Sequence, residues 1–212
     1  MFNEATVIGG VVEEIRRTFP HVVCVDDGSS DESVNEALRA GAHTVRHPIN
    51  LGQGASLQTG FEYALADPMM TEVVTFDADG QHRVEDAADM VERLRRENLD
   101  VVIGSRFLDD RTELSRAKRI TLRTAAVFTR LTTGMALTDA HNGLRVIGRD
   151  LLEKIHLHQN RMAHASEIVE QIGGHRAKWG EHPTHIVYTE YSKSKGQSLL
   201  NGVNILVELL LK

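Results

Sequence analysis

The sequence has 212 residues, of which 41% are hydrophobic and 25% are charged, proportions that are ordinary for a globular protein. A chain of this length supports one hydrophobic core, so we expect a single domain. The formal charge of −6 argues against a general nucleic-acid-binding protein, which would be basic. The single cysteine, Cys24, excludes an internal disulfide and favours a reducing compartment, so we expect a cytoplasmic protein.

Segments with helical and strand patterns alternate along the first half of the chain. Apolar residues at helical spacing predict helices over 5–19, 55–66 and 84–97, and a further helix that is capped by Ser30 or Asp31 and ends near Ala40. Short apolar runs predict strands over 22–25, 43–46, 73–76 and 101–103. This alternation predicts an α/β fold in which helices cover both faces of a mostly parallel sheet. Later in the chain we expect a strand through Ile147, a helix after the segment 159–167, and a last strand over 186–188.

Polar motifs that contain glycine follow these predicted strands. They are D-D-G-S-S-D at 26–31, N-L-G-Q-G-A at 50–55, D-A-D-G-Q-H at 77–82 and G-S-R at 104–106. In open parallel sheets, ligands bind beyond the carboxyl ends of the strands. We therefore expect the motifs to form one shared site at that edge of the sheet.

The segment after the strand 73–76 has the residue types of a metal site. Asp77 and Asp79 are two positions apart, so both carboxylates point to the same side of an extended chain. Gly80 permits a sharp turn, and Gln81 can add a neutral oxygen ligand. An isolated Asp-x-Asp is more often a solvated turn, but its place after a buried strand favours a site for Mg²⁺ or Mn²⁺.

Residues 106–130 differ from the rest of the acidic chain. They include seven basic residues and three acidic ones, a local charge of +4. One interpretation is a solvated basic helix, and the alternative is a surface that meets phosphates or an anionic membrane. The apolar stretch from Leu199 to Leu211 is too short and too polar to span a bilayer, which needs about 20 residues. Membrane contact would therefore be peripheral.

Together, F-N-E at 2–4, V-D-D-G-S-S-D at 25–31, N-L-G-Q-G-A, D-A-D-G-Q-H and G-S-R resemble glycosyltransferase family 2. The sequence is most similar to the polyprenyl-phosphate branch of that family, which includes dolichol-phosphate-mannose synthases, and the resemblance covers essentially the whole chain. It implies a GT-A fold, a UDP- or GDP-linked sugar donor, a divalent metal, a polyprenyl phosphate acceptor and inversion at the anomeric carbon.

The resemblance also implies roles for individual residues. The donor-binding residues would be Asn3, Glu4, Asp26, Asp27, Gly54, Asp77, Ala78, Asp79 and Lys195. The metal ligands would be Asp77, Asp79 and Gln81. The acceptor phosphate would bind Arg106, helped by Lys118 or Arg119. The catalytic residues would be Asp79, Arg106, Asp139 and Glu167. Asp139 and Glu167 have an alternative as structural hydrogen-bond acceptors, and Lys195 has one as a solvated lysine.

Two features depart from the family pattern. A buried strand normally precedes F-N-E, whereas this chain starts at Met1. We therefore expect a gap in the sheet, a substitute strand, or a strand from a partner chain in a homo-oligomer. No transmembrane hairpin follows the last motif, so we expect peripheral contact with the cytoplasmic face of the membrane.

Residues 1–105 are expected to bind the nucleotide sugar, and residues 106–212 to face the acceptor. Transfer to a saccharide or another hydroxyl acceptor remains an alternative, as does a nucleotide-sugar-binding module without activity. A hydroxyl nucleophile needs a base, whereas a phosphate monoester, with a second pKa of about 6, is already largely ionised. The basic stretch 106–130 favours the phosphate.

Overall fold

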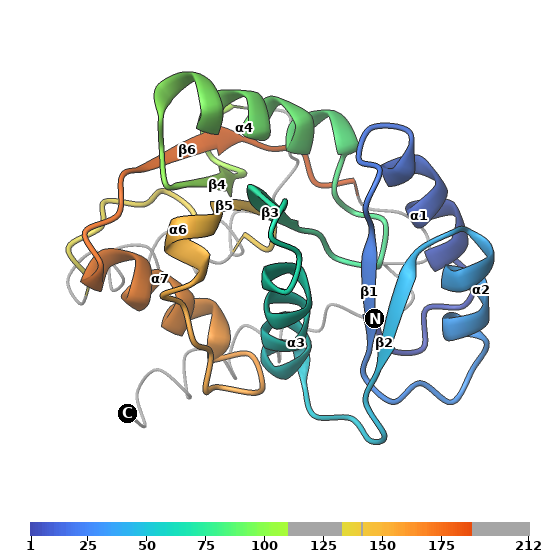
Figure 1. The fold of residues 1–212 in the computed structure, drawn as a ribbon. Coiled ribbons are helices and arrows are strands. Elements are labelled where there is room, and N and C mark those ends of the chain that lie inside the picture. The colour runs from blue at the N-terminus through green and yellow to red at the C-terminus, as the bar shows by residue number, and fades with distance from the viewer. Residues whose placement is uncertain (110–132, 141, 188–212) are drawn as a thin grey trace.

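The structure, a computed structural model, describes residues 1–109, 133–140 and 142–187. The helices are α1 (Ile8–Arg16), α2 (Ser33–Arg39), α3 (Gln53–Leu65), α4 (Val84–Glu97), α6 (Arg149–Leu152) and α7 (His164–Gly174). The strands are β1 (Val23–Asp26), β2 (His43–Arg46), β3 (Glu72–Thr75), β4 (Val101–Ser105), β5 (Arg145–Gly148) and β6 (Trp179–Pro183). Figure 1 shows their arrangement.

The described strands form two sheets. β1 and β2 pair in parallel, and the other four strands have the order β3-β5-β4-β6. β5 is antiparallel to both of its neighbours, while β6 is parallel to β4. β3, β4 and β6 therefore run in the same direction, and the predicted α/β fold is confirmed as one with mixed sheets. Because β5 lies between β3 and β4, residues after 106 complete a sheet that residues before 106 begin.

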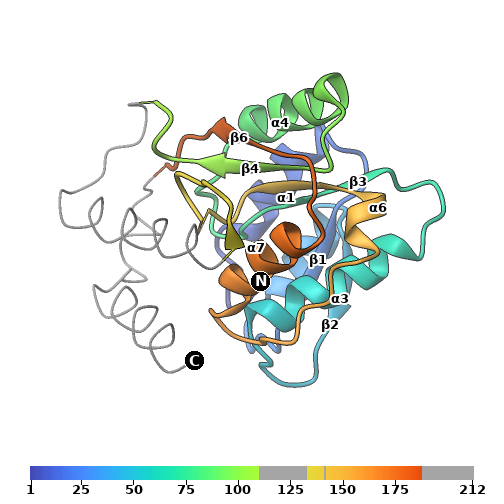
Figure 2. The ribbon, with the colours of Figure 1, turned by 90° about the vertical axis from the view of Figure 1, so that its left-hand side faces the viewer.

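Helices cover both faces of the four-stranded sheet, as Figures 1 and 2 show. On one face, Met90 and Leu94 of α4 pack against Val102 of β4 and Val146 of β5. On the other face, a larger core joins β4 and β5 to α3, α6 and α7. Alternate residues of β5 therefore point into different cores, as expected for a strand that is buried on both sides.

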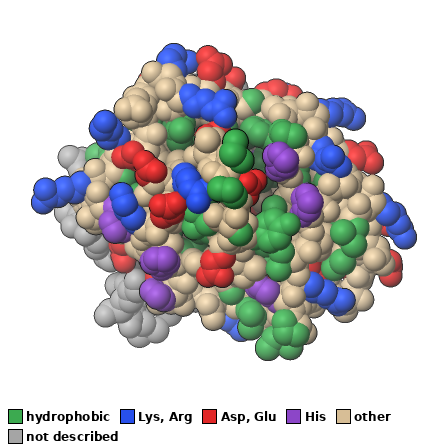
Figure 3. Space-filling view, viewed as in Figure 1, with side chains coloured by type: hydrophobic (Ala, Val, Ile, Leu, Met, Phe, Trp, Pro, Cys, Tyr) green, Lys and Arg blue, Asp and Glu red, His purple; other side chains and the backbone are tan. Residues whose placement is uncertain are grey.

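A gap separates the two sheets. Val25 O accepts a hydrogen bond from the Met1 ammonium at 2.7 Å, and Asp27 N–H donates to Met1 O at 2.9 Å. These bonds lie on the edge of β1 opposite β2, because the carbonyl of Asp26 faces β2 and accepts from His47 N–H. The apolar residues of β1 and β3 that flank the gap are less buried than those of β4, and the face in Figure 3 is hollowed in this area.

Among the described residues, no strand lies between β1 and β3, so the gap that was one of the three expected outcomes is present there. Within those residues, Met1 bonds to this edge of β1 through the two hydrogen bonds given above. Unpaired backbone groups at such an edge must be satisfied by water or by another segment.

Two local predictions were wrong. A strand was expected over 186–188, but the last described strand is β6, and residues 184–187 form none. β6 was not predicted because it contains Gly180 and Pro183, which have low strand propensity. The sheet tolerates Pro183 because β6 is an edge strand. The predicted helix after 159–167 starts earlier, at His164, so that Glu167 lies in its first turn.

Candidate functional site

Asp27 joins the end of β1 to the glycine-rich loop that follows β2. Its Oδ1 accepts from Leu51 N–H and its Oδ2 from Gly52 N–H, both at 2.8 Å. His47 Nδ1 lies 2.9 Å from Oδ1. Burial raises the pKa of Asp27, but the hydrogen bonds from His47, Leu51 and Gly52 outweigh it and lower the pKa below its usual value. The carboxylate of Asp27 therefore holds two predicted site loops together.

Asp26 presents an unused acceptor. Its side chain is 0% exposed; Oδ2 accepts from Ser29 N–H at 3.2 Å and lies 3.4 Å from Arg46 Nε. Oδ1 is buried without a hydrogen-bond partner in the described part of the chain. Buried polar atoms are nearly always paired, so this oxygen suits an N–H or O–H donor from a ligand.

The F-N-E segment lies directly on the loop after β1. Asn3 N–H donates to Ser29 Oγ at 2.9 Å, and Asn3 Oδ1 accepts from Ser30 N–H at the same distance. Glu4 N–H donates to Ser33 Oγ at 2.7 Å. Asn3 has a φ of +53°, a left-handed conformation that asparagine tolerates better than most residues. The structure therefore brings these two motifs into direct contact.

Asp77 lies at the carboxyl end of β3 and reaches the loop after β2. Oδ2 lies 3.0 Å from His82 Nε2, and Oδ1 accepts from Gln53 Nε2 at 3.1 Å. Burial raises the pKa of Asp77, but the hydrogen bond from His82 and nearby positive charge, including that of Arg145, lower it below its usual value. The Asp77 side chain is 39% exposed, so one side of it faces solvent.

Asp79 lies near Asp77 and directly precedes Gly80, whose φ of +72° confirms the expected sharp turn. Burial and the charge of Asp77 raise the pKa of Asp79, although its Oδ1 accepts from Gln81 N–H at 3.1 Å. Two carboxylates this close disfavour double ionisation, and a bound cation removes that cost.

The donor set at this turn fits a hard divalent cation. The described residues contain no group of three or more His, Cys, Asp and Glu side chains placed to hold a metal. Mg²⁺ and Mn²⁺ commonly use one or two carboxylates and fill the other positions with water and phosphate oxygens. Asp77 and Asp79 therefore suit these ions better than zinc, which takes a closed set of nitrogen and sulfur ligands.

Arg106 and Asp139 form a closely fitted ion pair at the end of β4. Asp139 accepts from Arg106 N–H at 3.1 Å, and from its Nε and a terminal nitrogen at 2.6 Å each. The side chains are 12% and 1% exposed. Both carboxylate oxygens thus contact the guanidinium, an arrangement that fixes its plane.

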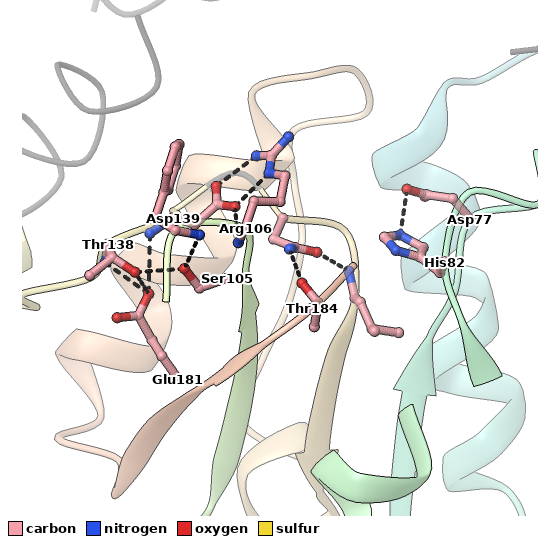
Figure 4. A network of polar contacts seen from close by, with 11 residues as sticks. Asp77, His82, Ser105, Arg106, Thr138, Asp139, Glu181 and Thr184 are labelled. Carbon is pink, nitrogen blue, oxygen red and sulfur yellow. Dashed lines mark hydrogen bonds and ion pairs between the residues drawn. The ribbon is translucent and has the colours of Figure 1, made fainter. Parts of the chain in front are cut away.

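The residues that support this pair were not predicted from the sequence. Glu181 Oε1 accepts from Thr138 N–H at 2.8 Å, from Thr138 Oγ1 at 3.0 Å and from Asp139 N–H at 3.1 Å. Ser105 Oγ lies 2.6 Å from Thr138 Oγ1. Burial raises the pKa of Glu181 above its usual value. Figure 4 shows this network on one side and the Asp77–His82 pair on the other.

Gly54 and Glu167 both hold the loop 158–160. Gly54 N–H donates to Asn160 O at 2.8 Å, and a Cβ at Gly54 would lie 1.9 Å from Gln159 O. Glu167 accepts from the N–H groups of His158 and Gln159 at 2.9 to 3.1 Å. This geometry supports the structural alternative for Glu167, while its catalytic role and donor binding by Gly54 stay predictions.

The remaining predicted site residues divide into two groups. Ala78 is half-buried and packs against the core of α1 that includes Ile8 and Val12. Lys118, Arg119 and Lys195 lie outside the described residues, as do most of the basic stretch and the segment 199–211. Within the described residues, no helix has the length and apolar character needed to cross a bilayer.

Comparison with known proteins identifies relatives along the whole chain. Residues 1–156 match the family described as glycosyl transferase family 2. An uncharacterized protein of Methanocaldococcus jannaschii is 35% identical over 100% of this chain and 88% of its own length. The UDP-N-acetylglucosamine–dolichyl-phosphate N-acetylglucosaminyltransferase of Methanococcus voltae is 26% identical over 99% of this chain and 92% of its own. The polyprenol monophosphomannose synthase of Mycolicibacterium smegmatis is 29% identical over 74% and 62%.

Solved structures share the fold at low sequence identity. Glucosyl-3-phosphoglycerate synthase from Mycobacterium tuberculosis, crystallised with Mg²⁺ and uridine diphosphate, superposes with a TM-score of 0.70 and 17% identity. The match covers 90% of this chain and 69% of that one. The predicted GT-A fold is therefore confirmed.

Proposed function

Because this chain belongs to glycosyl transferase family 2 and is a glycosyltransferase, we propose that it transfers a sugar from a nucleotide donor to a polyprenyl phosphate, with inversion and a divalent metal. One observation carries the proposal: the carboxylates of Asp77 and Asp79 lie at the carboxyl end of β3, and the Arg106–Asp139 pair lies at the end of β4, in the same sheet. The first group suits a metal-bound diphosphate, and the second suits an acceptor phosphate.

The donor side is supported by the loop after β1. The buried, unpartnered Oδ1 of Asp26 can accept a hydrogen bond from a nucleotide base or ribose. Asp77 and Asp79, with Gln81, would hold the metal, which would neutralise the charge that develops on the leaving nucleotide. The relative from Methanococcus voltae is named for a UDP-linked donor, and the M. tuberculosis enzyme of this fold was crystallised with Mg²⁺ and uridine diphosphate.

The acceptor side follows from the fixed position of Arg106. Asp139 orients the guanidinium, which can then present its charge to a phosphate monoester. That phosphate is largely ionised near neutral pH and needs no strong base. Both oxygens of Asp139 are engaged with Arg106, so we propose that Asp139 orients the acceptor site and takes no proton. The relative from M. voltae is named for a dolichyl-phosphate acceptor, and the relative from M. smegmatis is named for the product polyprenol monophosphomannose.

We further propose the division of labour in which residues 1–105 hold the donor and residues 106–212 face the acceptor. The basic stretch 106–130 would bring the chain to the cytoplasmic face of the membrane. Each basic residue near an anionic surface contributes roughly 1 kcal/mol, so several together would give reversible, peripheral binding.

A two-acceptor assay tests this function. Purified protein with Mn²⁺ is given UDP- and GDP-linked sugars and either undecaprenyl phosphate or a free sugar alcohol, and organic-phase product is measured. Arg106→Ala should raise KM for the lipid phosphate about tenfold or more, while donor affinity stays within twofold. Arg96→Ala, an exposed arginine on α4, is the matched control and should change neither quantity.

The outcomes separate the alternatives. Equal activity toward the two acceptors, unaffected by Arg106→Ala, would favour a hydroxyl acceptor, with Glu167 as the base to test. Nucleotide-sugar binding without transfer to any acceptor would favour an inactive binding module.

A further inference from the structure

Arg145 is a buried cation that has an unpaired donor in the described part of the chain. It is the first residue of β5 and only 2% exposed. Its Nε has no hydrogen-bond partner among the described residues. The two carboxylates whose charges act on it, Asp77 and Asp139, make hydrogen bonds with His82 and Arg106 instead. The Nε donor of this guanidinium is therefore not satisfied in the way that buried arginine donors normally are.

The direction of the Arg145 side chain follows from the alternation of β5. Val146 packs into the core under α4, whereas Ile147 packs into the core formed with α3 and α7. Arg145 shares the face of Ile147, so it points to the side of α3 and α7. Burial, helped by the charge of Arg145, lowers the pKa of His164 at the start of α7, so Arg145 lies near that residue.

Arg145 thus lies inside the site that the sequence motifs outline. Its backbone N–H donates to Thr75 Oγ1 at 3.1 Å, at the end of β3. Gly143, two residues earlier, is so close to Asp77 that a Cβ there would lie 2.5 Å from the Asp77 carboxylate. The side chain of Asp77 is 39% exposed, so this neighbour of Arg145 is in contact with solvent.

The Arg145 side chain is protonated near neutral pH. Burial lowers its pKa to about 10, although the charges of Asp77 and Asp139 act to raise it. The side chain is therefore still a cation at pH 7. Burying a charge without fitted hydrogen bonds costs several kcal/mol, and an oxyanion that accepts from the guanidinium would remove that cost.

We propose that Arg145 binds a phosphate oxygen of a substrate, between the carboxylate of Asp77 and the Arg106–Asp139 pair. This inference rests on the proposed function and adds a residue that the motifs did not mark. The phosphate belongs either to the donor's diphosphate or to the acceptor's monoester. The planar donors of the Arg145 guanidinium suit either phosphate, because a guanidinium pairs with phosphate through two parallel hydrogen bonds.

Binding measurements with one probe for each source test the assignment. Isothermal titration uses UDP with Mg²⁺ for the donor and farnesyl phosphate for the acceptor, on wild type, Arg145→Lys and the exposed control Arg96→Lys. Arg145→Lys keeps the charge but loses the forked donors. It should raise Kd about tenfold or more for at least one probe, and the affected probe identifies the source. The control should leave both values within twofold.

A purely structural counter-ion gives a different pattern. In that case Arg145→Lys lowers the unfolding midpoint and leaves both Kd values within twofold of wild type, a result that would overturn the inference. If Arg145→Lys does not fold, the ¹⁵Nε signal of Arg145 in the wild type replaces it. A shift of that signal with either probe supports phosphate binding, and an unmoved signal with both probes bound contradicts it.

The transfer assay separates this inference from the proposed function. If the wild type transfers sugar to undecaprenyl phosphate and the Kd values are unchanged in Arg145→Lys, phosphate binding by Arg145 is refuted and the proposed function is supported. If Arg145→Lys binds a probe more weakly and the wild type transfers no sugar, phosphate binding by Arg145 is supported and the proposed function is refuted.

Discussion

Separating Arg106 from Asp139 should destabilise the protein in a way that a double-mutant cycle can resolve. Asp139 is 1% exposed and accepts three hydrogen bonds from Arg106, one from the backbone and two from the guanidinium. In Arg106→Met the buried carboxylate loses both hydrogen bonds from the guanidinium, and removing one partner of a buried pair costs about 3–5 kcal/mol.

Asp139→Asn should lower the free energy of unfolding less than Arg106→Met does. Asp139→Asn keeps one carbonyl acceptor, and the 12% exposed Arg106 side chain retains some access to water. Loss of charge-assisted hydrogen bonds there should lower the free energy of unfolding by about 1.5–3 kcal/mol. The double variant removes both charges together, so it should be more stable than the sum of the single losses predicts, by about 1–3 kcal/mol.

Urea unfolding of the four proteins at pH 7 measures these values. A matched cycle on Arg96 and Glu92, an exposed pair one helical turn apart on α4, provides the control and should give a coupling below about 1 kcal/mol. If the losses of stability in the two single variants sum to the loss in the double variant within about 0.5 kcal/mol, Arg106 and Asp139 are not coupled. That result would refute the close, buried ion pair.

Three further predictions concern single residues. Asp79→Ala should abolish sugar transfer and metal-dependent donor binding while circular dichroism stays unchanged; full activity in excess chelator would contradict the metal site. Asp27→Ala should lower the free energy of unfolding by about 2–4 kcal/mol at pH 7, because two backbone N–H groups lose their acceptor. Since the folded pKa of Asp27 is lowered, this difference should shrink as the pH falls below about 4, and a constant difference down to pH 2 would argue against it. Glu181 has a raised folded pKa, so wild type should lose stability relative to Glu181→Gln as the pH rises from about 4 to 7 in thermal unfolding; the opposite slope would contradict that direction.

Much of the site could be predicted from the sequence because its signals are local. The strand His43–Arg46 and the helix Val84–Glu97 were predicted with the bounds that the structure has. Asp77 and Asp79 were placed beyond a strand end by the apolar run that precedes them. Each of these predictions depends on residues that are close in sequence, where side-chain periodicity and turn chemistry act directly.

The partners of these residues were decided by contacts between distant segments. The bond from Glu181 to Thr138 spans 43 positions and exists because β6 lies beside β4. The strand through Ile147 was predicted, but its antiparallel place between β3 and β4 was not. An apolar run of four residues is equally compatible with either direction and with several neighbours, so pairing depends on the whole sheet.

Arg145 shows the same division most clearly. In the sequence it is one arginine among many, two residues after a glycine and at the start of an apolar run. Its burial and its unpaired Nε donor among the described residues arise only when β5 enters the sheet between β3 and β4 and turns this side chain toward α3 and α7. The sequence by itself therefore determined the family, the strand ends and the carboxylates of the turn, because those depend on neighbouring residues. The tertiary structure decided which charges face one another, because burial and hydrogen-bond partners depend on segments that meet only in the folded chain.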